Sequence, residues 1–304
     1  MRFTTLSVST AALMAFAGAA LADVTITHNQ GELTVTEVPA KVFTQDWASF
    51  DNLSALGVTV LGVPAGNVPG YLAEQVSGDA VQIGSLFEPD FETIAAEAPD
   101  LITVGGRSAA TYPTMSGIVP TFDTSINNTD IIGGIKTRLT EFGEIFDLED
   151  KAAELVANLD AKVAEAREAA ADEGTGLVIV TNARNIGIYG PDSRVGWIYN
   201  ELAIPSVFDD VDDGDHGGDG ISFEYLVEKN PDWLFVVDRD AGTTDGTNGA
   251  AEALLDNELL AETTFMKNDQ IIYLSPQPAY ITMHGYQGVM LLLDEVIAGF
   301  QAND

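Results

Sequence analysis

The sequence predicts an α/β fold with two lobes, and three observations lead to this prediction. A segment containing a short helix and a buried strand occurs twice, at residues 88–107 and 222–239. A long Ala/Leu/Glu-rich helical pattern lies between the two copies, over residues 148–174. The chain is also long enough for two domains of about 100–150 residues each. We therefore expect two Rossmann-like lobes joined by a long backbone helix, with a ligand cleft between the lobes.

The repeated segment carries the same residues at the same spacing. In each copy a Glu lies seven residues before a Pro-Asp pair and fifteen residues before an Arg. Apolar residues at helical spacing after the Glu predict a short helix, which the Pro ends. The continuous apolar run after the Pro-Asp pair predicts a buried parallel strand. The residues are Glu92, Pro99, Asp100 and Arg107 in the first copy and Glu224, Pro231, Asp232 and Arg239 in the second.

The first lobe is predicted to open with a hairpin and to continue with strands and helices. The hairpin is expected from residues 24–27 and 33–38, around the turn sequence Asn29-Gln30-Gly31. The other elements are a strand at 41–43, a helix at 47–56, a strand at 58–63, a Pro/Gly-rich loop at 64–70, the first repeat and a short strand at 121–122.

A helical segment and a second lobe follow. The pattern is helical from residue 131 to about 172, and its second part suits a stiff spacer between lobes. Hinge motion would be small, because a helix bends less readily than two or three extended strands. The second lobe is predicted as strand, helix, strand and helix, with strands at 177–181, 233–237 and 271–274 and a closing helix at 285–298. The predicted domains are 23–135 for the first lobe, 136–174 for the spine and 175–304 for the second lobe.

The N-terminus predicts export. Residues 1–22 combine a short charged start, an apolar core and the small-x-small pattern Ala20-Leu21-Ala22 of a signal peptide. The sequence contains no cysteine, so it offers no disulfide framework, no thiolate metal site and no catalytic thiol. A lipid-anchor cysteine is also missing at the predicted cleavage site. We expect a free periplasmic protein that starts at Asp23.

The charge of the chain excludes two classes of partner. The formal net charge is −34, and removal of Arg2 with the signal peptide gives −35. Such an acidic surface repels nucleic acid and anionic membranes. The source habitat, halophilic or marine, would also explain this acidity, so the charge by itself assigns no function.

Three arginines are candidates for ligand binding. Arg107 and Arg239 each follow a predicted parallel strand, at the edge where open α/β sheets bind ligands. Arg194 lies in a predicted loop, in the segment GPDSRVG. A guanidinium is permanently charged and carries a fork of donors that matches carboxylates, catecholates and other oxyanions. Together they predict an anion site in a cleft between the lobes.

Two further residues are candidate iron ligands. His216 lies in the polar loop DVDDGDHGGDG with Gly on its C-terminal side, and Tyr280 lies in a predicted loop at 276–285. Phenolate oxygen suits Fe(III), and imidazole is a common iron ligand. His284 is the competing imidazole near Tyr280, whereas His28 beside the predicted hairpin has no supporting context.

No enzyme signature is present in the sequence. It contains no Ser nucleophile elbow, no phosphate-binding Gly loop and no zinc-type His pair at helical spacing. Acidic pairs are too frequent to specify a glycosidase site. The Asp/Gly-rich loop at 210–222 departs from the EF-hand spacing. We expect a protein without catalysis, and an exported hydrolase that uses acidic residues is the alternative from a different class.

The chain resembles the periplasmic iron(III)–siderophore binding proteins of ABC importers, within the helical-backbone class (class III) of solute-binding proteins. The resemblance runs over essentially the whole chain after residue 22, and is nearest to binders of catecholate and tetradentate siderophores. It is carried by segments 84–107, 188–202, 216–239, 254–260 and 267–276.

The resemblance implies a role for each candidate residue. Arg107, Arg194 and Arg239 match the arginines that hold the anionic siderophore. His216 and Tyr280 match the His and Tyr that complete the coordination of iron in relatives that bind tetradentate catecholates. Glu92 and Glu224 match glutamates on the two lobes that engage basic residues of the membrane permease.

The resemblance implies a monomeric carrier with no intrinsic cofactor, whose ligand is a ferric siderophore and whose partner is an inner-membrane ABC permease. A carrier for haem, cobalamin or another metal chelate is the alternative within the transport class. A free divalent metal ion is disfavoured, because the chain has three His and no compact His/Asp/Glu cluster is apparent in the sequence.

Overall fold

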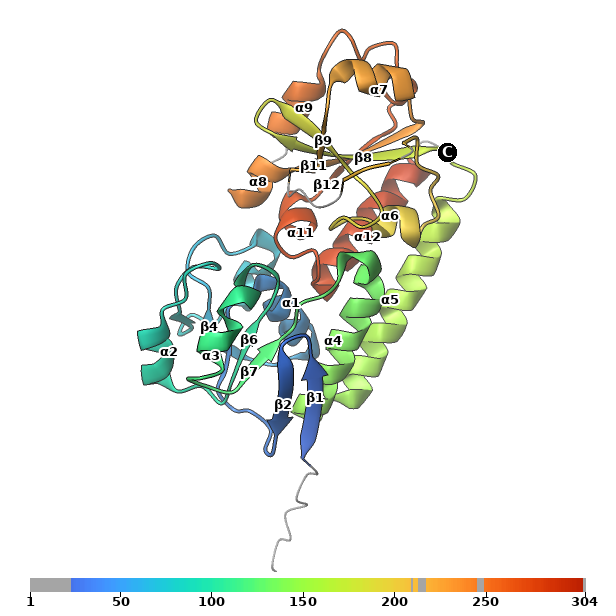
Figure 1. The fold of residues 1–304 in the computed structure, drawn as a ribbon. Coiled ribbons are helices and arrows are strands. Elements are labelled where there is room, and N and C mark those ends of the chain that lie inside the picture. The colour runs from blue at the N-terminus through green and yellow to red at the C-terminus, as the bar shows by residue number, and fades with distance from the viewer. Residues whose placement is uncertain (1–22, 209, 213–216, 245–248, 303–304) are drawn as a thin grey trace, which may run out of the picture.

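The computed structural model of the chain describes residues 23–208, 210–212, 217–244 and 249–302. Two five-stranded sheets lie in two lobes, and a long helix runs alongside both of them (Figure 1). The predicted α/β fold with two lobes is therefore confirmed. No helix within the described ranges is long and apolar enough to cross a membrane.

The first lobe holds a parallel sheet in the order β5-β4-β3-β6-β7 and a separate hairpin of β1 and β2. Its strands are β1 (Val24–His28), β2 (Gly31–Val35), β3 (Val42–Thr44), β4 (Val60–Val63), β5 (Val81–Gln82), β6 (Leu101–Val104) and β7 (Thr121–Asp123). Its helices are α1 (Trp47–Leu56), η1 (Gly70–Gln75), α2 (Phe91–Glu97), η2 (Gly106–Thr111), α3 (Tyr112–Met115) and η3 (Asn128–Asp130).

The predicted helical spine consists of two helices. Helix α4 (Ile131–Phe146) ends where Asp147 adopts a left-handed conformation with φ of 57°, and α5 (Glu149–Ala169) begins two residues later. At 1.5 Å per residue, the 21 residues of α5 extend over roughly 30 Å. Figure 1 shows this helix running past both lobes, as expected for the backbone helix. The domain boundaries at residues 135 and 174 stay a prediction.

The second lobe holds a mixed sheet in the order β10-β9-β8-β11-β12. Its strands are β8 (Gly176–Asn182), β9 (Asn185–Tyr189), β10 (Asp219–Ile221), β11 (Trp233–Asp238) and β12 (Ile271–Leu274). Its helices are α6 (Trp197–Asn200), α7 (Phe223–Lys229), α8 (Arg239–Thr243), α9 (Gly249–Leu255), α10 (Thr264–Lys267), α11 (Pro276–Tyr280) and α12 (Tyr286–Gln301).

Two expectations for the second lobe are wrong. A helix was expected after the first strand, but β9 turns back and pairs antiparallel with β8. Residues 276–285 were expected to form a loop, but their first half is α11, because Pro276 occupies the first turn, where its missing N–H is not needed. The second half of the segment, residues 281–285, connects this helix to α12.

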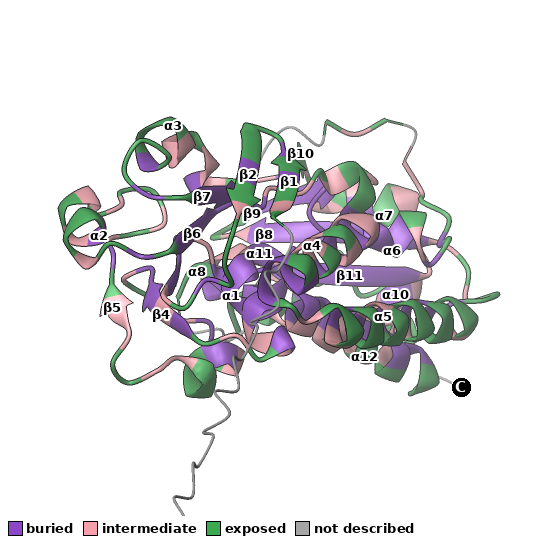
Figure 2. Cartoon of the chain, turned by 90° about the horizontal axis from the view of Figure 1, so that it is seen from below, coloured by how far each residue is buried: buried purple, intermediate pink, exposed green. Residues whose placement is uncertain are grey.

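Alternate residues of the strands face two different cores, as the pleat of a strand requires. In β8, Val178 and Val180 face a large core, whereas Leu177 and Ile179 face a smaller core under α7, α9 and α10. The large core continues through α12, α5, α4 and α1 into the first lobe. Figure 2 shows these strands as buried ribbon behind the exposed outer surface of α5. One apolar core therefore joins the two lobes, which favours a stiff arrangement.

The Pro-Asp pair of each repeat joins two neighbouring strands. Asp100 accepts hydrogen bonds from the backbone N–H groups of Ala40 and Lys41, at 3.0 and 2.7 Å, just before β3. Asp232 accepts one from the N–H of Thr175 at 2.7 Å, just before β8. Each Asp thus satisfies backbone donors at the start of the adjacent parallel strand, where the ladder has not yet begun. The two copies of the repeat therefore share this structural contact as well as their sequence pattern.

Candidate functional site

The two sheets bring their carboxyl ends to the same region of the molecule. Arg107 is in η2, directly after β6 of the first lobe, and Arg239 begins α8, directly after β11 of the second lobe. Arg194 lies between β9 and α6. The predicted placement of two arginines at strand ends is therefore confirmed.

Tyr280 lies at the centre of the three arginines. Its backbone carbonyl oxygen accepts a hydrogen bond from Nη2 of Arg107 at 2.7 Å and another from Nη1 of Arg194 at 3.2 Å. Its hydroxyl oxygen accepts one from Nε of Arg239 at 2.8 Å. The guanidinium carbons of Arg194, Arg107 and Arg239 lie 4.3, 5.4 and 5.7 Å from the centre of the phenol ring, which is the geometry of cation–π contacts. Four residues predicted from the sequence therefore form one cluster.

The three charges of this cluster are partly withdrawn from water, since Arg194 is buried and Arg107 and Arg239 are half-buried. Desolvation lowers the pKa of Arg107, and the positive charge of Arg194 lowers it further. Arg194 is 5% exposed, so water screens the two charges from each other only weakly. Within the described parts of the chain, no carboxylate lies within ion-pairing distance of Arg107 or Arg239. Arg107 and Arg239 therefore carry positive charge beside the cavity without a direct ion pair to a described carboxylate.

A half-buried carboxylate, Asp46, lies near Arg107. Asp46 caps helix α1 by accepting hydrogen bonds from the N–H and hydroxyl groups of Ser49 at 2.8 and 3.0 Å. Burial raises the pKa of Asp46, while the bonds from Ser49 and the charge of Arg107 oppose that rise. This acid was not recognised in the sequence, although an Asp directly before an apolar helical segment is a signal for a helix cap.

A cavity of about 960 Å³ opens beside the arginines. Its lining combines cationic, polar and apolar side chains from both lobes. The lining residues are Phe87, Gly106, Arg107, Ser125, Ile126, Asn127, Asn128, Thr129, Tyr189, Asp192, Ser193, Arg194, Val211, Asp212, Met283 and His284. This volume and mixed lining suit a small organic ligand that carries anionic oxygens. Tyr280, which is 5% exposed, lies behind the lining rather than in it.

The three histidines have different positions. His216 falls outside the described residues, and its neighbour in the loop, Asp212, lines the cavity. His284 also lines the cavity, with Nε2 3.0 Å from Oδ1 of Asn128. Desolvation, followed by the charges of Arg194 and Arg107, lowers the pKa of His284 to about 4, so its imidazole is neutral near pH 7. His284 therefore adds a neutral imidazole to the lining.

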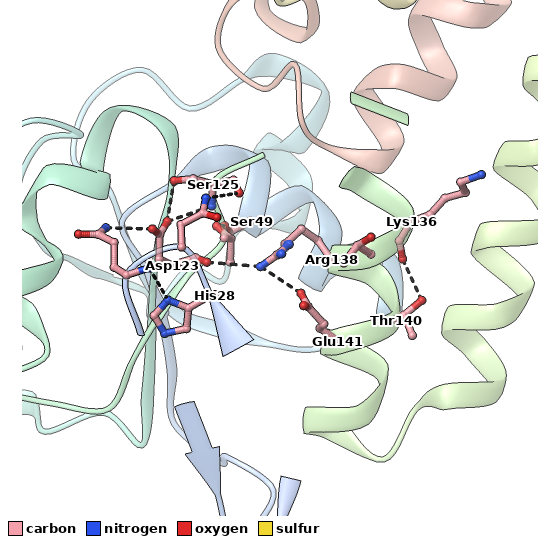
Figure 3. A network of polar contacts seen from close by, with 12 residues as sticks. His28, Ser49, Asp123, Ser125, Lys136, Arg138, Thr140 and Glu141 are labelled. Atoms are coloured by element: carbon pink, nitrogen blue, oxygen red, sulfur yellow. Dashed lines mark hydrogen bonds and ion pairs between the residues drawn. The ribbon is translucent and has the colours of Figure 1, made fainter. Parts of the chain in front are cut away.

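His28 belongs to a separate network in the first lobe (Figure 3). Asp123 accepts hydrogen bonds from Gln30 at 2.9 Å and from the Ser125 hydroxyl at 2.6 Å, and Arg138 pairs with Glu141 at 3.0 Å. The Gln30 bond attaches the β1–β2 hairpin to β7, and Nη1 of Arg138 attaches α4 to β7 by donating to the Asp123 carbonyl oxygen at 3.4 Å. The network is structural, and His28 does not line the cavity.

Among the residues that the structure describes, no group of three or more His, Cys, Asp or Glu side chains is arranged to hold a metal ion. The described part of the cavity wall offers two arginines, two amides, two separate carboxylates and the imidazole of His284.

Glu92 and Glu224 occupy equivalent positions in the two lobes. Each is the second residue of a seven-residue helix, α2 or α7, and each side chain is exposed. Asp90 and Ser222 cap the two helices in the same way, by accepting a hydrogen bond from the third helical N–H. Figure 1 shows the two helices on different lobes.

Most of the lining residues were not anticipated from the sequence, among them Phe87, Asn128 and Met283. Asn128 begins η3, and Met283 lies in the connection between α11 and α12. For Phe87 a signal was present, because a large apolar residue stands in the turn-forming context Gly84-Ser85-Leu86-Phe87-Glu88-Pro89.

Comparison with known proteins gives consistent matches. The family model described as periplasmic binding protein matches residues 42–278. The petrobactin-binding protein YclQ of Bacillus subtilis is 31% identical, with 91% of this chain and 88% of YclQ covered. The ferric-anguibactin-binding protein FatB of Vibrio anguillarum is 29% identical, with 92% of this chain and 88% of FatB covered.

Solved structures agree with these matches. The structure of YclQ has a TM-score of 0.86 at 30% identity, and the match covers 92% of this chain and 99% of that one. The catecholate-siderophore binding protein VctP of Vibrio cholerae has a TM-score of 0.83 at 28% identity, and the match covers 92% of this chain and 100% of that one.

Proposed function

This chain belongs to the periplasmic binding protein family, and from that premise we propose that it captures a ferric siderophore in its cleft and delivers it to the permease of an ABC importer. The relatives YclQ and FatB are named for binding petrobactin and ferric anguibactin, and VctP for binding catecholate siderophores. The protein is a carrier in this proposal and catalyses no reaction. The siderophore complex is its ligand, not a resident cofactor.

The observation that carries the proposal is the cluster of three arginines around Tyr280. Arg107 comes from the first lobe, whereas Arg194 and Arg239 come from the second, so both lobes contribute positive charge to one cavity wall. A ferric complex with an excess of anionic oxygens would exchange the bonds to the Tyr280 carbonyl for charge-assisted hydrogen bonds. Such bonds strengthen as the ligand displaces water from the cavity.

We also propose that His216 and Tyr280 complete the coordination of iron when the siderophore leaves positions open. The Tyr280 hydroxyl oxygen accepts a hydrogen bond from Arg239, and a phenol oxygen is the kind of hard donor that suits Fe(III). His284, a neutral imidazole in the cavity lining, is the competing nitrogen donor.

Docking to the permease is assigned to Glu92 and Glu224. One exposed carboxylate on each lobe suits a partner with two-fold symmetry and basic residues at both contact sites. We further propose that residues 1–22 are a signal peptide, that the protein is free in the periplasm, and that it is a monomer.

A binding panel tests this function. The purified protein, starting at Asp23, is titrated with ferric siderophores of different chemistry, haem and cobalamin while the fluorescence of its three Trp residues is recorded. Saturable quenching by a ferric siderophore at sub-micromolar concentration is the expected result. Preference for haem or cobalamin would replace the proposed ligand, and turnover of a substrate would restore the enzyme alternative.

A further inference from the structure

Phe87 is a large apolar side chain that is exposed at the cavity. It is 67% exposed, more than any other large hydrophobic side chain in the described part of the structure; the next, Leu259, is 45% exposed. Its ring lines the 960 Å³ cavity together with Arg107 and Arg194. It also lines a recess of about 200 Å³, with Trp47, Leu86 and Ile281. Phe87 therefore belongs to the lining of both spaces.

The turn that carries Phe87 is held firmly. Gly84 and Pro89 form an antiparallel bridge across it. The N–H of Ser85 donates to the carbonyl of Glu88 at 3.0 Å, and the N–H of Glu88 donates to the Ser85 hydroxyl at 3.0 Å. A Cβ at Gly84 would come within 2.4 Å of the Glu88 carbonyl oxygen, so the close turn requires this glycine.

A buried side chain also fixes this turn to the sheet. Gln45, which is fully buried directly after β3, donates from its amide nitrogen to the backbone carbonyl of Ser85. The backbone N–H of Gln45 is bonded to the carbonyl of Thr103 at 2.8 Å. The position of Phe87 is thus coupled to the strand ends that also position Arg107, and its exposure is built into a fixed turn.

The arginines and Phe87 together limit which ligands can use both the positive charge and the exposed aromatic ring. Covering exposed apolar surface in a cleft favours ligand binding, because it removes that surface from water. The arginines require anionic oxygens, and Phe87 offers an aromatic ring that prefers stacked or edge-to-face contact with another ring. Catecholates and phenolates carry anionic oxygens directly on an aryl ring, so they meet both requirements. Citrate and hydroxamates carry the oxygens without the ring.

We infer that Phe87 is a specificity-determining residue, and that its ring packs against an aryl ring of the bound ferric chelate. The inference rests on the proposed function, since it concerns which ferric chelates the cavity selects. In this inference Phe87, held by the fixed turn at residues 84–89, discriminates between aryl and non-aryl chelates. The arginines supply the electrostatic attraction that all anionic chelates share.

The test compares wild type, Phe87→Ala and Phe87→Tyr with three probes: Fe(III) held by a bis-catecholamide chelator, Fe(III)–citrate and an Fe(III) hydroxamate. We expect Phe87→Ala to weaken binding of the catecholamide complex about tenfold. Its effect on citrate and hydroxamate complexes should stay within about twofold. Phe87→Tyr keeps the ring and should keep wild-type affinity for the catecholamide complex. Leu259→Ala, an exposed apolar residue outside the cavity lining, is the matched control.

Each result has a defined meaning. Equal losses for all three probes, or no loss with the catecholamide complex, overturn the inference and leave the proposed function standing. Binding of only the citrate and hydroxamate complexes by wild-type protein also overturns the inference and leaves the proposed function standing. Wild-type protein that binds no ferric chelate overturns both proposals. Thermal unfolding of the three variants checks that they remain folded, which the exposure of Phe87 leads us to expect.

Discussion

Nε of Arg239 donates a hydrogen bond to the hydroxyl oxygen of Tyr280 at 2.8 Å, and this bond raises the pKa of the guanidinium. Arg239 ends the second copy of the repeat, whereas Tyr280 belongs to a helix 41 residues further along the chain. The repeated part of the sequence therefore contacts its non-repeated part here, as it also does where Arg107 donates to the Tyr280 carbonyl oxygen. The pair of Arg239 and Tyr280 connects the anion site to the candidate iron ligand.

Replacing Arg194 by Ala should weaken ferric siderophore binding by at least about 1 kcal/mol, the scale of a lost charge-assisted hydrogen bond. Arg184 lies in the same lobe, is exposed and does not line the cavity, so Arg184→Ala is the matched control. Fluorescence titration measures both affinities. Equal affinity of Arg194→Ala and wild type would remove Arg194 from the site.

Tyr280→Phe should change the visible charge-transfer band of a bound tetradentate ferric complex, because the variant lacks the oxygen that would bind iron. His216→Ala should change the same band by removing the nitrogen donor. Tyr225→Phe, on α7 and away from the cavity lining, should leave the spectrum unchanged. Spectra identical to wild type in both site variants would show that neither residue binds iron, even where affinity persists.

His284 should titrate near pH 4 in the folded protein, because burial and the charges of Arg194 and Arg107 lower its pKa. Arg194→Ala removes one of these charges, so the pKa of His284 should rise toward its ordinary value of 6.5. NMR titration of the imidazole C–H signals measures this change. His28 is an internal control, since Asp123 and Arg138 are the charges that act on it. A His284 pKa that is insensitive to Arg194→Ala would contradict the geometry of the cluster.

Asp51 should make the stability of the protein depend on pH. It is fully buried on α1 and accepts hydrogen bonds from Tyr71 at 2.6 Å and from the N–H groups of Gln287 and Gly288, at 2.7 and 2.9 Å, at the start of α12. Burial raises its pKa from 3.8 to about 6, so between these values the native state binds more protons than the unfolded chain.

This group's contribution to the free energy of unfolding therefore rises as pH falls from 7 to 5, by on the order of 1 kcal/mol. Asp51→Asn removes the titrating carboxyl. Denaturant unfolding at pH 7 and at pH 5 measures the free energy of unfolding of both proteins. The stability of wild type relative to Asp51→Asn should be greater at pH 5 than at pH 7. Parallel pH dependence of the two proteins would mean that Asp51 does not titrate in this range. Direct NMR measurement of the Asp51 carboxyl provides an independent check.

Glu92→Ala and Glu224→Ala should each reduce ligand delivery to the permease without changing siderophore affinity. Both side chains are exposed at the start of short helices, and neither lines the cavity. Glu168→Ala on the exposed surface of α5 changes the net charge equally and should have no effect. Stimulation of the permease ATPase by the loaded protein is the measurement. Full stimulation by the double variant would refute the docking assignment.

The repeat explains why so much of the architecture could be predicted. Pro99 and Pro231 end helices by local sterics, and the apolar runs that follow can only be buried, so strand, helix and following Arg could be located from the sequence. The antiparallel β9 was missed, because whether a buried strand turns back depends on partners elsewhere in the sheet. Helix α11 was taken as a loop, because five residues give too little periodicity to decide.

By itself, the sequence determined the two lobes, the backbone helix and the identity of the cationic residues, because spacing and charge are local properties. The tertiary structure alone decided that Arg107, Arg194 and Arg239 converge on Tyr280, since these residues are brought together by packing of two separate sheets. It also decided that Phe87 faces the same cavity, because the turn at 84–89 is fixed by Gln45, a residue forty positions away. Contacts across such distances depend on the folded core and have no signature in local sequence.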